Sequence, residues 1–169
     1  MFNPPQRLWS RCAASAKRNG GTILGYTEVV QMMNGVAGNC GVFSTAMDIS
    51  IFGQMMLNKG IYNGKRIFSP QIIEVMTKPD PKFPNVARGF GWDLGIPNSA
   101  LRGDIFPIGG FGQVGWTGPS LWVDPDSETV IVIMANRLHP GKKIEPTHDY
   151  LLLRMKALIT NIVAGSIID

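Results

Sequence analysis

The sequence predicts an α+β fold, in which helices come first, an antiparallel sheet follows and one further helix closes the chain. Three observations lead to this prediction. Residues 45–57 have the capping residues and apolar spacing of an amphipathic helix, residues 90–136 hold short strand-like segments separated by turns, and residues 150–164 again place apolar side chains at helical spacing.

Length and composition limit the class of protein. The chain has 169 residues, of which 44% are hydrophobic and 17% charged, so it can bury a core and is not disordered. We expect one domain over residues 1–169, with a loop and helical region at 1–87 and the sheet strands and closing helix at 88–169. Its apolar runs are too short for a membrane span, and two cysteines are too few for a disulfide scaffold or a four-ligand zinc site. The net charge of +4 comes from scattered Lys and Arg, which favours a solvated surface over a nucleic-acid site.

The N-terminal region is expected to be mostly loop up to about residue 40, apart from a short helix near residues 7–16. The first well-defined element then begins. Thr45 and Asp48 have the spacing of a capping box, apolar residues follow at helical spacing, and Asn58-Lys59-Gly60 supplies a glycine stop. This pattern predicts a helix of roughly three turns.

Two further signals follow this helix. Asn63-Gly64 lies between short apolar segments and predicts a tight hairpin turn. Ser69-Pro70 then starts a second helix, with Ser as the N-cap and Pro at the first helical position.

The second half of the chain is predicted to form the sheet. Phe90, Trp92 and Leu94 alternate with smaller or polar residues, as in a strand with one buried face. Three further strands are expected at residues 113–116, 120–124 and 129–136, with a turn at 125–128. The final helix, at about 150–164, is expected to lie over this sheet with Leu152, Met155, Leu158, Ile159 and Ile162 at helical spacing.

Searches for a catalytic motif within the chain fail. No serine begins a Ser-x-x-Lys sequence, there is no Gly-x-Ser-x-Gly elbow, and His139 and His148 flank a polar loop as surface histidines do. Residues 110–115 match the G-x-G-x-x-G fingerprint, but the Trp-Thr-Gly-Pro that follows cannot comfortably open the helix that a dinucleotide site needs. These glycines are expected to let two backbones approach closely or to permit a bulge.

Two segments are specific enough to indicate a family. Residues 35–48, Gly-Val-Ala-Gly-Asn-Cys-Gly-Val-Phe-Ser-Thr-Ala-Met-Asp, resemble a stretch of the serine β-lactamase-like hydrolases, which group class C β-lactamases, low-molecular-weight penicillin-binding proteins and related esterases. Residues 112–125 and 136–140 resemble the family's third-motif strand, the neighbouring strand and the Asn-Arg-Val-His-Pro that follows it. Phe2-Asn3-Pro4-Pro5 also matches, at a point beyond the family's nucleophile.

The resemblance implies a partial β-lactamase/transpeptidase-like fold from a hydrolase that cleaves β-lactam, peptide or ester bonds through an acyl-enzyme; no cofactor or metal is expected. Family members carry a Ser and a Lys on one helix, and a Tyr or Ser with an Asn on a loop, ahead of the region matched here. This chain has neither motif, and Tyr26, Tyr62 and Tyr150 each lack an Asn two residues on. We therefore expect the C-terminal portion of such a hydrolase, with no catalytic residue of its own and inactive alone.

The family's third motif, Lys or His followed by Thr and Gly, is altered. The register set by residues 121–125 places Gln113, Val114 and Gly115 at the three positions and the oxyanion-hole N–H at Trp116. Gln113 carries no charge and Val114 has no hydroxyl group. The resemblance therefore implies either a divergent substrate-binding site, suited to a neutral acyl substrate, or a decayed motif that is kept as a sheet strand.

A second hypothesis stays open, namely a non-catalytic binding or structural module that keeps this fold and recognises peptidoglycan-like peptides or a protein partner. Without the family's first strands, the sheet would expose an edge that recruits either a complementary N-terminal chain or a second copy of this chain. The parent family acts on small-molecule or peptide acyl substrates, and no nucleic-acid partner is expected. A location outside the cytoplasm rests on the resemblance alone.

Overall fold

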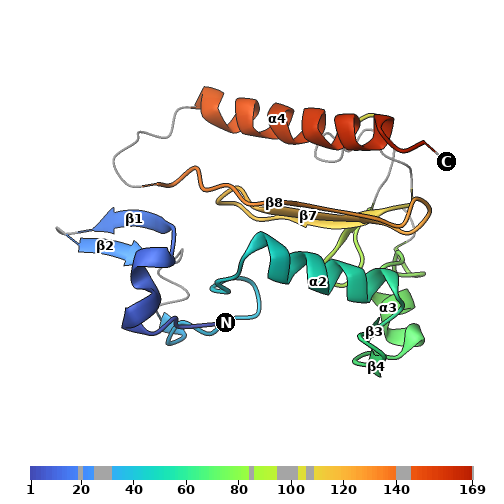
Figure 1. The fold of residues 1–169 in the computed structure, drawn as a ribbon, viewed down its shortest axis with the longest axis horizontal. Coiled ribbons are helices and arrows are strands. Elements are labelled where there is room, and N and C mark those ends of the chain that lie inside the picture. Colours follow the sequence, from blue (N-terminus) through green and yellow to red (C-terminus); the bar gives the residue numbers. More distant parts are fainter. Residues whose placement is uncertain are drawn as a thin grey trace.

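The computed structural model describes residues 1–18, 21–24, 32–83, 86–94, 103–105, 109–139 and 146–168. These residues form the predicted α+β fold, with an antiparallel sheet between helix α2 (Ala46–Leu57) and helix α4 (Pro146–Gly165) (Figure 1). The sheet has the order β5-β6-β7-β8, with bounds β5 Asp93–Leu94, β6 Phe111–Val114, β7 Ser120–Asp124 and β8 Thr129–Ile133.

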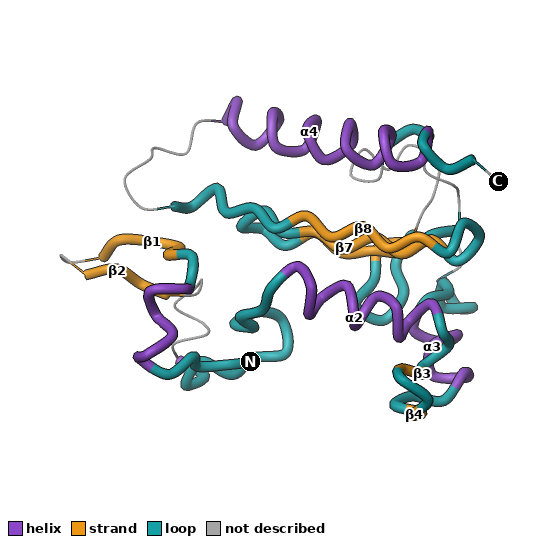
Figure 2. Tube along the Cα trace, viewed as in Figure 1, coloured by secondary structure: helices purple, strands orange, loops and turns teal. Residues whose placement is uncertain are grey.

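Both faces of the sheet are covered, because side chains of successive strand residues point to opposite faces. Leu121 and Val123 of β7 pack in one cluster with Met55 and Met56 of α2. Trp122, between them in sequence, packs on the other face together with residues from β8 and α4. Figure 2 shows this arrangement of α2, strands β7 and β8, and α4 in successive layers. The whole of β7 is buried as a result.

The predicted cap of α2 is confirmed. The Thr45 Oγ1 accepts a hydrogen bond from the Asp48 backbone N–H at 3.1 Å, which satisfies one of the unpaired donors at the start of the helix. Gly53 lets α2 approach the sheet closely, because a Cβ at that position would lie 2.5 Å from the Val130 Cγ1. The position of α2 on β7 and β8 therefore depends on a glycine in the middle of the helix.

The two local predictions after α2 are also confirmed. Strands β3 (Ile61–Tyr62) and β4 (Lys65–Arg66) form a hairpin, and both residues of its turn, Asn63 and Gly64, have positive φ. Helix α3 (Pro70–Met76) is capped by Ser69, whose Oγ accepts a hydrogen bond from the Ile72 N–H at 3.2 Å.

The prediction for the N-terminal region is wrong in part. Instead of a helix at 7–16 within a long loop, a 3₁₀ helix η1 (Gln6–Arg11) is followed by a hairpin of β1 (Ala14–Arg18) and β2 (Gly21–Leu24). This hairpin lies beyond the N-terminal end of α2 in Figure 1. It is joined to the segment after β8 by a 2.8 Å hydrogen bond from the Asn136 Nδ2 to the Ala14 carbonyl. Strand pairing of this kind depends on contacts that local residue patterns do not encode.

Two other predictions need correction. The alternation at residues 90–94 holds for Trp92 and Leu94, which are buried, but Phe90 is 65% exposed and only Asp93–Leu94 forms a strand. Helix α4 lies over the sheet as predicted, but Met155, Leu158 and Ile162 point away from it and are exposed.

Of the helices in the described ranges, none combines the length and apolar character that crossing a membrane requires.

Candidate functional site

The three expected third-motif positions and the expected oxyanion donor, Trp116, lie together at the end of β6. Gln113 and Val114 are the last two residues of this strand and pair with Leu121 and Ser120 of β7. Gly115 and Trp116 follow directly. The Gly115 N–H donates to the Pro119 carbonyl at 2.8 Å, so the chain turns sharply there. The G-x-G-x-x-G match thus lies on a strand and a turn, and no helix follows it.

The close backbone approach expected of these glycines is found at Gly112. This residue pairs with Trp122 on β7, and a Cβ added to it would lie 2.3 Å from the Trp122 Cε3. Any side chain at this position would therefore displace the indole ring, which fills the layer between the sheet and α4.

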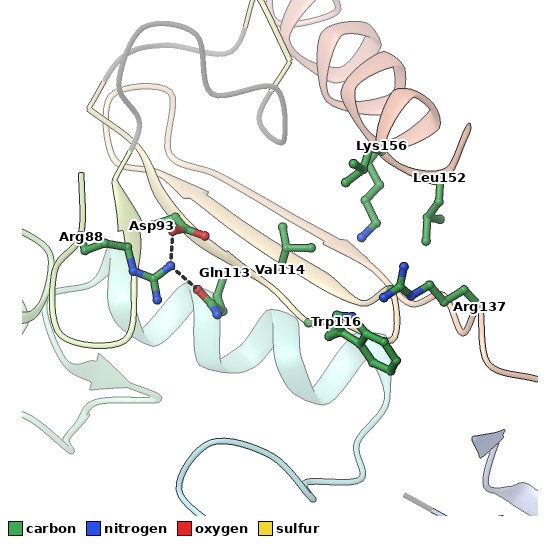
Figure 3. Close-up of a pocket in the computed structure, with 11 residues that line it drawn as sticks. Arg88, Asp93, Gln113, Val114, Trp116, Arg137, Leu152 and Lys156 are labelled. Atoms are coloured by element: carbon green, nitrogen blue, oxygen red, sulfur yellow. Dashed lines mark hydrogen bonds and ion pairs between the residues drawn. The ribbon is translucent and has the colours of Figure 1, made fainter. Parts of the chain in front are cut away.

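A pocket of about 390 Å³ opens beside these residues, between β6 and α4 (Figure 3). The third-motif positions contribute to one wall, and segments that are distant in the sequence contribute to the others. The lining residues are Arg88, Asp93, Gln113, Val114, Gly115, Trp116, Gly118, Arg137, Leu152, Leu153 and Lys156. All four candidate positions are thus brought together in one pocket.

At one end of the pocket, Gln113 is tied to a pair of charged residues. Arg88 forms an ion pair with Asp93, and the same Arg88 Nη1 lies 3.4 Å from the Gln113 Oε1 (Figure 3). The amide oxygen of Gln113 therefore accepts from a cation. Its NH₂ group is the part that can donate to a ligand.

At the other end, Trp116 and Arg137 stack on one another. The guanidinium carbon of Arg137 lies 4.3 Å from the centroid of the Trp116 ring, within the range of a cation–π interaction. The Arg137 backbone N–H donates to the Thr117 carbonyl at 2.8 Å. These two contacts fix the segment after β8 against the turn that follows β6.

Lys156 of α4 closes the pocket from the side of the helix. Its residue surface is only 1% exposed, and its ammonium group points toward the space between Val114 and Arg137 (Figure 3). Burial lowers the pKa of the Lys156 ammonium group, and the positive charge of Arg137 lowers it further. An amine in such surroundings gives up its proton more readily than an ordinary surface lysine.

Residue patterns did not point to Lys156 or to a pocket role for Arg137. Arg137 belongs to the Asn-Arg-Leu-His-Pro segment, whose resemblance indicated a family but not a function for the residue. A signal for Lys156 does exist, because it lies four residues after Leu152 and four before Thr160, on the face of α4 that turns out to be inward. The two histidines stay outside the pocket's described lining. His139 is exposed, and the side chain of His148 and the whole of Pro140 lie outside the described residues.

The described lining of the pocket can bind and orient a ligand, but it holds no nucleophilic hydroxyl or thiol group. Its charged groups are two guanidinium groups, one ammonium group and one carboxylate. Such a set favours an anionic ligand on electrostatic grounds. An attacking serine would have to come from outside this lining.

Comparison with known proteins agrees with the α+β fold described above. Residues 1–154 of the 169 match the family described as Beta-lactamase. The chain therefore belongs to the Beta-lactamase family.

Curated relatives match a shorter part of the chain. A putative D-alanyl-D-alanine carboxypeptidase of Salmonella agona (strain SL483) is 33% identical over 110 residues, which cover 63% of this chain and 25% of that protein. An N-acetylmuramyl-L-alanine amidase of Bacillus subtilis (strain 168) is 32% identical over 107 residues, 63% of this chain and 24% of that protein. The chain spans about a quarter of the length of these relatives.

Proposed function

We propose that this chain is the C-terminal portion of a β-lactamase-like serine hydrolase and supplies one wall of an acyl-enzyme active site. The observation that carries the proposal is the pocket beside β6, whose lining includes Gln113, Val114, Gly115 and Trp116. The family resemblance assigns the first three to the third motif and the N–H of Trp116 to the oxyanion donor. In this role β6 orients the acyl substrate, and the backbone N–H of Trp116 is the candidate oxyanion donor. Residues 1–169 would act as one unit, with residues 1–87 supporting the strands and closing helix of residues 88–169.

The family and the names of its relatives support a choice among substrate classes. Members of the family cleave β-lactam, peptide or ester bonds. The two relatives carry the names of a carboxypeptidase and an amidase, so an amide or peptide bond is the first candidate. The uncharged side chains of Gln113 and Val114 differ from the family's Lys or His and Thr, which makes a divergent substrate preference part of the proposal.

The chain alone should not hydrolyse such substrates. Its sequence lacks Ser-x-x-Lys and Tyr-x-Asn, and the described lining of the pocket has no hydroxyl or thiol group. The nucleophile and its activating base must then come from a complementary N-terminal segment. The edge of β8 suits such a segment, because among the described strands β8 pairs with β7 alone. Pairing with a second copy of this chain would use the same edge.

The test is covalent labelling of the purified chain with a fluorophosphonate probe and with a fluorescent penicillin, together with assays of nitrocefin and p-nitrophenyl acetate. We expect no labelled serine and no turnover above the buffer rate. When a segment that carries both missing motifs is added, labelling should appear on the serine of that segment. A labelled serine within residues 1–169 of the chain alone would contradict the proposal.

A second candidate function is a non-catalytic binding module, and one observation favours it. The Arg88–Asp93 pair holds the amide oxygen of Gln113, so the residue at the first third-motif position is partly engaged by the protein itself. If the added segment restores no labelling while the chain still binds ligands in this pocket, the binding module becomes the better description.

A further inference from the structure

Lys156 lies in the layer between α4 and the sheet. Taking an ammonium group out of water is costly unless a carboxylate or another acceptor compensates for the lost hydration. Lys156 is 1% exposed. The neighbouring buried polar residue on the same face, Thr160, satisfies its hydroxyl within the helix by donating to the Lys156 and Ala157 carbonyls.

No acidic residue in the described part of the chain compensates for Lys156. The charge that affects its pKa is that of Arg137, which has the same sign. The carboxylate that lines the pocket, Asp93, is engaged by Arg88 at the opposite end (Figure 3). The α4 end of the pocket therefore holds two converging positive groups.

The two positive groups are held by the fold. Arg137 is stacked on Trp116 at 4.3 Å and its backbone is bonded to Thr117, while Lys156 extends from the middle of a twenty-residue helix. Figure 3 shows the ammonium and guanidinium groups directed toward the same space, with Val114 and Leu152 beside them. A site that is assembled before the ligand arrives loses little entropy on binding.

We propose that Lys156 and Arg137 form an oxyanion-binding site at the α4 end of this pocket, and that the oxyanion is the carboxylate of the acyl substrate. The inference rests on the proposed function for the identity of that carboxylate. It assigns to α4 and to the segment after β8 the positive charge that Gln113 lacks. Free inorganic phosphate is recognised by the same kind of positively charged groups. The anion-binding experiment distinguishes phosphate from a substrate carboxylate.

The experiment measures anion binding by the full chain, by calorimetric titration and by the shift in the unfolding temperature. The probes are sodium acetate, N-acetyl-D-alanine and inorganic phosphate, each compared with sodium chloride at the same ionic strength. We expect N-acetyl-D-alanine to bind more tightly than acetate or phosphate, because Val114 and Leu152 offer contacts to its methyl group. Tighter binding of phosphate than of either carboxylate would overturn the assignment to a substrate carboxylate.

Variants of Lys156 separate a binding role from a structural one. Lys156→Met removes a buried charge, so the unfolding temperature without anion should rise while affinity for N-acetyl-D-alanine falls at least about tenfold. Lys156→Arg should keep most of the affinity, and Lys65→Met, at an exposed position on β4, should change neither property. Unchanged affinity in Lys156→Met would overturn the proposal.

One more measurement covers the case in which Lys156→Met does not fold. In the unmodified chain with ¹³C-labelled lysine, the Lys156 Cε resonance should shift during titration with N-acetyl-D-alanine while that of Lys65 stays constant. The absence of such a shift would also overturn the proposal. These measurements need no catalysis, so they can succeed even when an added N-terminal segment restores no activity. That combination would refute the proposed function, and Lys156 and Arg137 would remain an oxyanion-binding site without an assigned acyl substrate.

Discussion

Asp124 shows how one buried residue fixes the geometry of the β7–β8 connection. Its side chain is completely buried at the end of β7. Its carboxylate accepts hydrogen bonds from the Asp126 N–H at 3.2 Å and the Ser127 N–H at 3.1 Å, and it is also bonded to the Ser127 hydroxyl. The sequence indicated a turn at residues 125–128, and the carboxylate that organises this turn is that of Asp124, the residue before it.

Replacing Asp124 should therefore destabilise the protein. In Asp124→Ala, the N–H groups of the turn lose their acceptor in a partly buried setting, which costs about 1–3 kcal/mol of unfolding free energy. Asp126→Ala is the matched control, because Asp126 is exposed and should change stability by less than about 0.5 kcal/mol. Urea unfolding followed by tryptophan fluorescence measures both. Equal effects of the two variants would refute this role of Asp124.

At the scale of single elements, local signals predicted helices and turns well. The Thr45 and Ser69 caps fixed the starts of α2 and α3, and Asn63-Gly64 fixed the small hairpin, because each of these signals acts within four residues. The β1–β2 hairpin was missed. Its stability depends on pairing between strands and on a bond from the distant Asn136, neither of which is visible in a short window of sequence.

Helix α4 shows why periodicity alone did not orient a helix. Apolar residues occur on both of its sides, so the spacing of Met155, Leu158 and Ile162 fits an inward face as well as the true one. The sheet instead contacts the side that carries Val163 and Ala164, together with the polar Lys156. This polar residue is therefore buried on the side of the helix that faces the sheet.

Two adjacent residues test this orientation of α4. Val163 packs against the cluster of Trp122 and Ile131, whereas Ile162 is 71% exposed. Val163→Ala removes two methyl groups from a partly buried site and should cost about 1 kcal/mol of unfolding free energy. Ile162→Ala removes more carbon atoms but should cost less than about 0.5 kcal/mol. The reverse order in urea unfolding would show that α4 presents its other face to the sheet.

At the scale of the whole molecule, the candidate site is assembled from segments far apart in the chain. The location of the β6 positions could be predicted, because the pairing with β7 fixes their register. Their role in binding substrate stays a prediction from the family resemblance. The contributions of Arg88, Arg137 and Lys156 could not, because they depend on how the segments before β5 and after β8, and α4, pack around the strand. A sequence pattern can thus identify the wall of this pocket but not its electrostatic character.

That electrostatic character makes the stability of the whole molecule depend on pH. The pKa of Lys156 in the folded protein lies below its ordinary value of 10.5, because of burial first and of Arg137 second. At pH values between the lowered pKa and 10.5, Lys156 is protonated in the unfolded chain but has released its proton in the folded chain. The free energy of unfolding therefore rises with pH across that interval and gains nothing from Lys156 at lower pH.

The comparison of the unmodified chain with Lys156→Met isolates this contribution. All other ionisable groups are common to both proteins, so their contributions cancel in the difference. The other charged groups that line the pocket are the Arg137 guanidinium group and, at the far end, the Arg88–Asp93 ion pair. In urea unfolding from pH 7 to pH 10.5 in sodium chloride, the stability advantage of Lys156→Met should shrink as the pH rises. Lys65→Met should follow the unmodified chain at every pH. Parallel curves for the unmodified chain and Lys156→Met would mean that the Lys156 ammonium group is not held in an unfavourable environment, and the charge of the pocket would then need another explanation.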